Sequence, residues 1–211
     1  MSKQLVKVRV RSITAEADTV HSYELVPVDA RELPAFTAGA HVDLHLGNGM
    51  VRSYSLVNDQ QERHRYVVAV NKDANSRGGS RFVHEKLRAG DVLEISAPRN
   101  NFVLHEDVPH TILIAGGIGI TPLLAMARRL EALGRSWKLF YAARSRSAAA
   151  FLDQFETLRP DIRSYVQTDF DDDRDGRVFD LANIVRAAPA DARTTCSSND
   201  VMTTTGMSRS R

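Results

Sequence analysis

The sequence predicts two domains of different construction: an antiparallel β-barrel over residues 1–104 and an α/β domain with a doubly wound parallel sheet over residues 109–192. In the first half, short segments alternate apolar and polar side chains, as strands with one buried face do. After Pro109, apolar runs alternate with helical patterns, as in βαβ units. We expect residues 193–211 to form an irregular tail that leaves the second sheet incomplete at its C-terminal end, because Thr, Ser and Arg dominate them without a helical stripe.

The strands expected in the first half are short and closely spaced. The first contains Val6, Val8 and Val10, which alternate with charged residues. Turn signals such as Gly47-Asn48-Gly49 separate the later strands. One short helix is expected over residues 81–87. Six strands in this arrangement indicate an antiparallel barrel; those after the first are expected at residues 22–26, 41–46, 54–57, 66–70 and 92–96.

The second half opens with a strand buried on both faces. Residues 111–115 are a continuous apolar run, which is typical of a parallel strand. A glycine turn and a helix follow, and we expect Thr121 to cap this helix, Pro122 to take its first position and Gly134 to end it. The remaining elements are expected as strands at residues 138–142 and 164–168 and helices at residues 148–158 and 181–187.

Composition excludes several classes of protein. The net charge is only +2, and nucleic-acid-binding proteins usually carry a concentrated basic surface. No apolar run approaches the roughly 18 residues that a membrane span needs, and no signal peptide is recognisable. We therefore expect a soluble cytoplasmic protein that binds neither nucleic acid nor a membrane.

The metal-ligating residues are few. Cys196 is the one cysteine, which rules out a disulfide within the chain and fits a reducing compartment. An iron–sulfur cluster of the plant ferredoxin type needs about four cysteine ligands, so this chain cannot hold one. His41 and His45 alternate on an expected strand with no further ligand nearby. We interpret them as solvent-facing and expect no metal site.

The strongest local motif is Gly116-Gly117-Ile118-Gly119-Ile120-Thr121-Pro122, which directly joins the buried strand to the helix. Glycines let the backbone pass close to a pyrophosphate, and the free N–H groups at a helix start attract its charge. The motif differs from the G-x-G-x-x-G fingerprint of the common dinucleotide fold. Its position between strand and helix nevertheless favours a nucleotide site over a plain tight turn.

Two segments of the first half have the character of a second phosphate site. Arg52-Ser53-Tyr54-Ser55 offers a guanidinium for a phosphate, a flat aromatic face and two hydroxyls. Arg77-Gly78-Gly79-Ser80 precedes the short helix and resembles an anion nest. One phosphate site in each domain, with an aromatic platform, fits a flavin facing a nicotinamide.

These motifs resemble those of the ferredoxin–NADP reductase superfamily, and more closely its phthalate dioxygenase reductase and vanillate demethylase reductase branch. Residues 52–55 match the R-x-Y-S flavin motif, residues 77–80 a second flavin segment, and residues 116–122 the G-G-x-G-x-T-P nicotinamide motif. Residues 141–146 also look like this branch. The resemblance covers about residues 3–192.

The resemblance implies a role for each matching residue. Arg52 would bind the FMN phosphate, Tyr54 would lie against the flavin ring, and Ser55 would reach the reactive nitrogen edge of the flavin. Thr121 would lie beside the nicotinamide, and Cys196 stands roughly where the family has the cysteine of a C-G-P turn; with Ser55 these two are the expected catalytic residues. The other flavin-binding residues implied are Ser53, Leu56, Ala69, Asn71, Arg77, Gly78, Gly79 and Ser80, and the other nucleotide-binding residues are Gly116, Gly117, Gly119, Arg144 and Arg146.

The implied function is hydride transfer from NADH to FMN, followed by electron transfer to an iron–sulfur protein, as the reductase component of an aromatic oxygenase or demethylase system. The family normally continues into a ferredoxin domain, and this sequence ends before it, so a separate ferredoxin or oxygenase component is the expected acceptor. Arginines after the second strand of the nucleotide domain, Arg144 and Arg146, favour NADPH by the usual rule, whereas the branch resemblance favours NADH, which we follow. The alternatives are a reductase that uses FAD and NADPH, and a catalytically impaired flavin-binding module.

Overall fold

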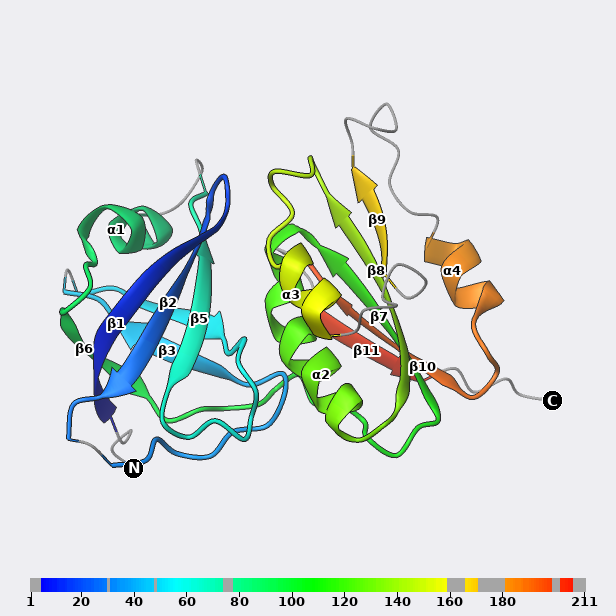
Figure 1. The fold of residues 1–211 in the computed structure, drawn as a ribbon, viewed down its shortest axis with the longest axis horizontal. Coiled ribbons are helices and arrows are strands. Elements are labelled where there is room, and N and C mark those ends of the chain that lie inside the picture. Colours follow the sequence, from blue (N-terminus) through cyan, green and yellow to red (C-terminus); the bar gives the residue numbers. More distant parts are fainter. Residues whose placement is uncertain are drawn as a thin grey trace. The chain divides into compact units, whose positions relative to one another are not determined.

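The structure is a computed structural model of the 211-residue chain. It describes residues 5–29, 31–47, 49–73, 78–158, 166–170, 181–198 and 202–206. The chain divides into two compact units, Met1–Val103 and Leu104–Arg211 (Figure 1). The division falls next to residue 104, where the sequence analysis ends the first domain.

The first unit is a six-stranded sheet with the strand order β4-β3-β6-β1-β2-β5, and every pairing between its neighbours is antiparallel. The helix α1 (Gly79–Lys86) lies against β5 and begins two residues earlier than expected. The edge strands β4 and β5 approach one another at a single bridge between Leu56 and Val68, which curls the sheet toward a barrel. The strands are β1 (Leu5–Ala17), β2 (Val20–Pro27), β3 (His41–His45), β4 (Val51–Ser55), β5 (Tyr66–Asn71) and β6 (Val92–Ser96).

Alternation along these strands forms the core of the first unit. Val8 and Val10 of β1, Leu25 of β2 and Leu44 of β3 have no exposed surface, while the sequence neighbours of the two valines are exposed. The same rule places Arg52 and Tyr54 on the face of β4 that carries the core, because they pair with Leu44 and Val42 across the β3–β4 ladder.

The second unit is a five-stranded sheet with the order β11-β10-β7-β8-β9. Pairs β7–β8, β8–β9 and β10–β7 are parallel, and β11 adds an antiparallel edge. The predicted fold class, an antiparallel barrel-like domain followed by an α/β domain with a parallel sheet, is thereby confirmed. The elements are β7 (His110–Gly116), the 3-10 turn η1 (Gly117–Gly119), α2 (Ile120–Ala132), β8 (Ser136–Ala143), α3 (Leu152–Leu158), β9 (Val166–Phe170), α4 (Leu181–Ala187), β10 (Ala192–Ser197) and β11 (Met202–Gly206).

The segment expected as an irregular tail differs from that expectation. β10 lies parallel to β7 with Cys196 opposite Ile114, and β11 pairs with β10. The sheet is therefore not missing the strand beside β7. Thr194, Thr195 and Ser197 of β10 are buried although they are polar. β-branched threonines suit the extended backbone, so β10 forms without the apolar run that a central parallel strand usually has.

Two helices pack on one face of the second sheet. The fully buried Trp137 of β8 lies 6.3 Å from the ring of Phe155 in α3, and its indole N–H donates to Glu131 at the end of α2. α2 stops where Gly134 adopts a left-handed φ of 62°, as its glycine predicted. Because only the turn η1 separates β7 from α2, the start of α2 lies at the carboxyl end of β7.

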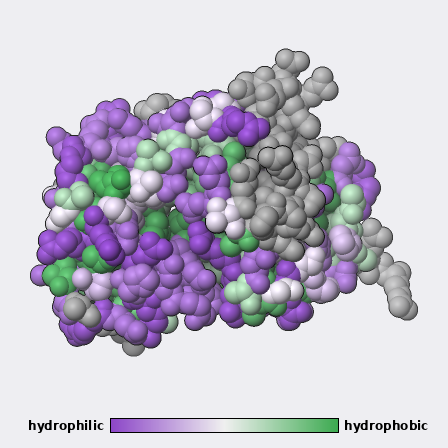
Figure 2. Space-filling model, viewed as in Figure 1, coloured by the Kyte–Doolittle hydropathy of each residue, from purple (hydrophilic) through white to green (hydrophobic). Residues whose placement is uncertain are grey.

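On the face shown in Figure 2, hydrophilic residues dominate and apolar residues form small, separate patches. Within the described part of the chain, no helix combines the length and apolar character that crossing a bilayer requires.

Candidate functional site

The two flavin motifs of the first unit meet at the start of α1. The side chain of Arg52 lies so close to Gly79 that a Cβ on Gly79 would be 2.5 Å from the arginine Nε and 2.8 Å from its Cγ. Glycine is thus required for the arginine stem to lie across the helix start. Arg52 is further held by hydrogen bonds to the Val51 carbonyl at 2.8 Å and to the Met50 sulfur at 3.4 Å. A guanidinium and the N-terminal amides of a helix therefore meet at one place.

The start of α1 has the features of an anion cradle. Gly78, the cap residue of α1, adopts a left-handed φ of 94° and as a glycine offers no side-chain cap to the first N–H groups of the helix. The Ser80 Oγ is buried and has no hydrogen-bond partner among the described residues. A buried hydroxyl without a partner is costly unless a ligand satisfies it. Arg77 lies outside the described residues. The cradle formed by Arg52, Gly79 and Ser80 fits a phosphate group.

Tyr54 follows Arg52 by two positions and lies on the same strand face. It is half-buried against the core of the first unit. Burial raises the pKa of the Tyr54 phenol to about 12, although the charge of Arg52 acts in the opposite direction. The phenol is therefore neutral at physiological pH, and an apolar aromatic face stands beside the phosphate cradle, as a stacked ring would need.

The structure places Ser53 and Ser55 on the opposite face of β4 from Arg52 and Tyr54. The Ser53 hydroxyl donates a 2.6 Å hydrogen bond to Asp43 of β3, and Ser55 pairs in register with His41. His41 is half-buried rather than fully solvent-facing, with its Nε2 3.4 Å from the Arg99 guanidinium. Burial, and next the charge of Arg99, lower the pKa of His41. Sequence reasoning missed this polar group, because an acidic residue between His41 and His45 does not by itself indicate that Asp43 is buried.

Three further residues implied as flavin-binding belong to the barrel itself. Leu56 has no exposed surface, and Ala69 is 4% exposed. Asn71 accepts a 2.7 Å hydrogen bond from the Thr19 hydroxyl through its side-chain oxygen. The side chains of Leu56 and Ala69 therefore act by shaping the barrel.

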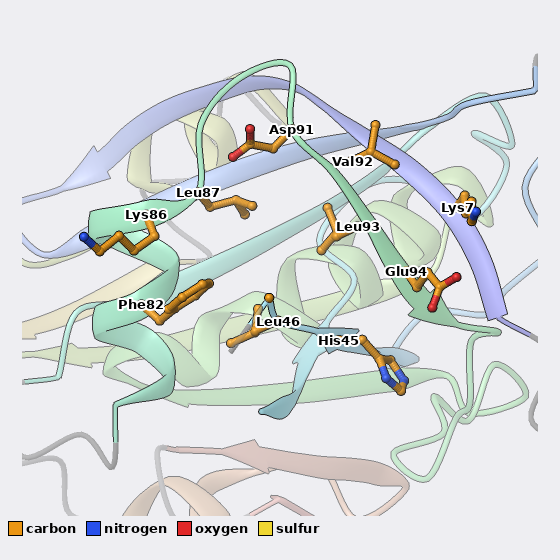
Figure 3. Close-up of a pocket in the computed structure, with 11 residues that line it drawn as sticks. Lys7, His45, Leu46, Phe82, Lys86, Leu87, Asp91, Val92, Leu93 and Glu94 are labelled. Carbon is orange, nitrogen blue, oxygen red and sulfur yellow. The ribbon is translucent and has the colours of Figure 1, made fainter. Parts of the chain in front are cut away.

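A surface pocket of about 580 Å³ lies elsewhere on the first unit (Figure 3). Phe82 and Leu87 line it from α1 and the residue that follows, and Leu93 lines it from β6. None of its lining residues is among the predicted site residues. Within the described part of the chain, no group of three or more His, Cys, Asp or Glu side chains could hold a metal ion.

In the second unit, the glycine turn lies at the point where the order of the sheet reverses. The chain runs from β7 to β8 and β9 on one side and returns with β10 on the other. Ligands of open α/β sheets bind in the crevice at the carboxyl ends of the strands next to such a point. Gly116, Gly117 and Ile118 are partly exposed there, and Gly117 has a left-handed φ of 50°.

β10 ends directly against this turn. A Cβ on Gly119 would lie 2.2 Å from the Ser197 carbonyl oxygen and 2.7 Å from the Ser198 amide nitrogen. A Cβ on Gly116 would lie 3.2 Å from the Ser198 Cβ. The Ser197 hydroxyl is fully buried and has no partner among the described residues. Gly119 thus has a packing role, and the unpaired hydroxyl beside a phosphate-type turn fits a polar ligand.

The prediction that Thr121 caps α2 is wrong. The turn η1 runs straight into α2, which begins at Ile120 with Gly119 as its cap residue and without a side-chain cap. Thr121 is the second residue of the helix, and its hydroxyl donates to the Ile118 carbonyl at 3.0 Å. Pro122 is therefore the third helical residue. Thr121 is 6% exposed and holds the turn in shape.

Cys196 lies on the face of the sheet away from the Ser197 hydroxyl. It packs with Ile112, Ile114 and Phe140 in an apolar cluster. Burial raises the pKa of the Cys196 thiol, so it is protonated at neutral pH. Arg144 and Arg146 are exposed just after β8, at the same edge of the sheet as the glycine turn.

Comparison with solved structures shows that this pair of domains is similar to parts of longer electron-transfer proteins. Phthalate dioxygenase reductase, described as a modular structure for electron transfer from pyridine nucleotides to [2Fe-2S], superimposes with a TM-score of 0.86 at 38% identity, covering 93% of this chain and 61% of that chain. A type IV self-sufficient cytochrome P450 monooxygenase matches with a TM-score of 0.83 at 34% identity, over 91% of this chain and 24% of that one. No family model matches the sequence.

Sequence comparison finds relatives of the predicted branch. Tetrachlorobenzoquinone reductase of Sphingobium chlorophenolicum is 46% identical over 197 residues, which are 93% of this chain and 61% of that protein. Vanillate O-demethylase oxidoreductase of Pseudomonas putida is 44% identical over 83% of this chain and 54% of its own length. Phthalate dioxygenase reductase of Burkholderia cepacia is 39% identical over 94% of this chain and 62% of its own length. The predicted relationship to the phthalate dioxygenase and vanillate demethylase reductases is confirmed, and the chain spans about 60% of the length of most of these relatives.

Proposed function

We propose that the chain is an NADH-dependent flavin oxidoreductase that binds FMN in its first unit and NADH in its second. The observation that carries the proposal is the meeting of Arg52 with the start of α1, next to the unpaired Ser80 hydroxyl and the face of Tyr54. The glycine turn at the switch point of the second sheet supports a dinucleotide there.

In this function the chemistry of hydride acceptance and single-electron release belongs to the flavin. The protein would bind the flavin and the nicotinamide dinucleotide and orient them. Arg52, Gly79 and Ser80 would hold the phosphate of the flavin. Tyr54, whose phenol stays neutral, would lie against one face of the flavin ring. The Gly116–Gly119 turn would receive the pyrophosphate at the start of α2. Thr121 supports this turn through its bond to the Ile118 carbonyl.

The acceptor is proposed as a separate iron–sulfur protein of an aromatic oxygenase or demethylase system. Two observations support this: relatives at 44% and 39% identity are named vanillate O-demethylase oxidoreductase and phthalate dioxygenase reductase, and Cys196 is the one cysteine of the sequence. The isolated chain should therefore show a flavin spectrum without iron–sulfur bands. It should reduce small artificial acceptors with NADH and drive an oxygenase only when a ferredoxin is added.

The decisive measurement is the chemical identity of the bound flavin. Heat release and chromatography of the bound flavin should give FMN; FAD would select the alternative reductase. Anaerobic mixing with NADH should bleach the flavin. A protein that holds flavin but leaves it yellow with both NADH and NADPH would be a binding module, and a protein that holds no flavin would refute the proposal altogether.

A further inference from the structure

A buried carboxylate on the outer face of the first unit links three segments of chain. Asp43 of β3 has a side chain that is 8% exposed. One of its oxygens, Oδ1, accepts a 2.6 Å hydrogen bond from the Ser53 hydroxyl of β4. The other, Oδ2, accepts a 2.8 Å bond from the Arg99 guanidinium, which follows β6. Both oxygens of the carboxylate are thus engaged, each with a different part of the barrel.

The backbone around Asp43 is fixed to the same segment. The Asp43 amide donates to the Ser96 hydroxyl at 2.9 Å, and that hydroxyl donates onward to the Ala97 carbonyl. His41 and Arg99 exchange both backbone hydrogen bonds, at 2.8 and 2.9 Å. Asp43 is therefore held rigidly from the side of β6, which makes it a firm support for whatever it contacts on β4.

β4 needs such a support because it is an edge strand. In the first sheet it pairs with β3 alone, apart from the single bridge from the next residue, Leu56. Ser53 lies between Arg52 and Tyr54 in sequence and points to the opposite face. A tilt or slip of β4 would move the guanidinium of the phosphate cradle and the aromatic face together.

We propose that Asp43 is a positioning residue for the flavin site, acting through Ser53 on β4 without touching the ligand. This inference rests on the proposed function. It also gives Ser53 a different role from the predicted one. The Ser53 hydroxyl donates to Asp43 on the opposite face of β4 from Arg52 and Tyr54, so Ser53 would act on the flavin site by holding β4 in place. A hydrogen bond between neutral and charged partners is stronger than one between neutral groups, and this one joins an edge strand of the sheet to a carboxylate whose two oxygens are both engaged.

The barrel contains a matched pair that can serve as control. Ser12 of β1 and Glu24 of β2 are also direct cross-strand partners, and the Ser12 hydroxyl donates to Glu24 at 3.1 Å. Glu24, like Asp43, lies near an arginine, Arg65. Ser12→Ala therefore removes the same kind of bond from strands that carry none of the predicted flavin residues.

The test measures flavin affinity and thermal stability together on the full chain, titrated as apoprotein with FMN. Ser53→Ala and Asp43→Asn should each raise the Kd for FMN about tenfold, the lower range for a hydrogen bond to a charged group. The asparagine oxygen can still accept from Arg99, but its N–H₂ group must then donate to the Ser53 hydroxyl, so the charge-assisted bond from Ser53 is lost. Ser53→Thr should restore the parent Kd, and the double variant should be no weaker than the worse single variant.

Ser12→Ala should lower the melting temperature about as much as Ser53→Ala while leaving the Kd unchanged. Equal loss of affinity in Ser12→Ala would show a global effect and overturn the proposal. So would a parent-like Kd in both Ser53→Ala and Asp43→Asn, whatever their melting temperatures. A parent chain that binds no flavin would instead refute the proposed function itself, and the two failures are therefore distinguishable.

Discussion

Replacing Gly79 by alanine should weaken flavin binding without weakening the fold. The new Cβ would lie 2.5 Å from Nε, 2.8 Å from Cγ and 3.0 Å from Cδ of Arg52. Contacts with three successive atoms of the stem cannot be relieved by moving the tip alone, so Arg52 must leave the start of α1. Losing a charge-assisted contact costs about 1.5–3 kcal/mol, which corresponds to roughly a 10- to 100-fold higher Kd. In a helix, alanine stabilises the folded state by about 0.5–1 kcal/mol relative to glycine. This gain would offset the loss of the Arg52 packing, so the melting temperature should stay near that of the parent.

The assay is fluorescence titration of the apoprotein with FMN, together with thermal denaturation. Gly47→Ala is the control, because its Cβ would meet only the Phe82 ring at an ordinary 3.8 Å, and it should keep the parent Kd. Arg52→Ala should purify folded but largely colourless. If Gly79→Ala acts through Arg52, the double variant should bind no more weakly than Arg52→Ala alone. Additive effects of Gly79→Ala and Arg52→Ala, or a parent-like Kd for Gly79→Ala, would refute the reasoning.

Three further predictions concern the second unit. Gly119→Ala places a Cβ 2.2 Å from a backbone oxygen of Ser197, so it should cost about 1–3 kcal/mol of stability and weaken NADH binding; a parent-like denaturation curve would contradict this. Steady-state kcat/KM should be higher with NADH than with NADPH, and a clear preference for NADPH would instead assign the exposed Arg144 and Arg146 to a 2′-phosphate. Cys196, whose thiol pKa is raised by burial, should be alkylated by iodoacetamide with a rate that rises only above the pH at which a free thiol ionises. The urea-unfolded chain should lose this shift, and a midpoint at or below that of a free thiol would disprove the burial.

The strands were predictable where alternation is regular and were misjudged where it breaks. Val6, Val8 and Val10 indicated β1, yet the strand continues to Ala17. Its register with β2 shifts between Val10 and Ser12. A bulge of this kind changes which side chains face inward, so the alternation that marks a strand is lost beyond it. β10 was missed for another reason: its Thr-Thr-Cys-Ser sequence has no apolar run, and its burial comes from pairing with β7.

The sequence predicts the candidate site as a list of residues, and it does not predict how the structure arranges them. The sequence marks Arg52 and Gly79 separately as phosphate-type residues, but 27 positions separate them, and only the docking of α1 brings them together. Asp43 gave almost no signal, because an acidic residue on an alternating strand is usually solvated. Its burial depends on Arg99, more than 50 residues away.

The glycines of the two motifs show that a motif alone does not tell which atoms approach each glycine. Both motifs were interpreted as places where backbone approaches a phosphate. At Gly79, however, the missing Cβ admits the stem of Arg52, so the glycine serves the anion site through an arginine. At Gly119 it admits the carbonyl of Ser197, so the glycine lets β10 end beside the turn. A substitution at Gly79 should therefore separate ligand binding from stability, because only a side chain moves, whereas one at Gly119 must affect both, because the backbone of a central strand has to shift.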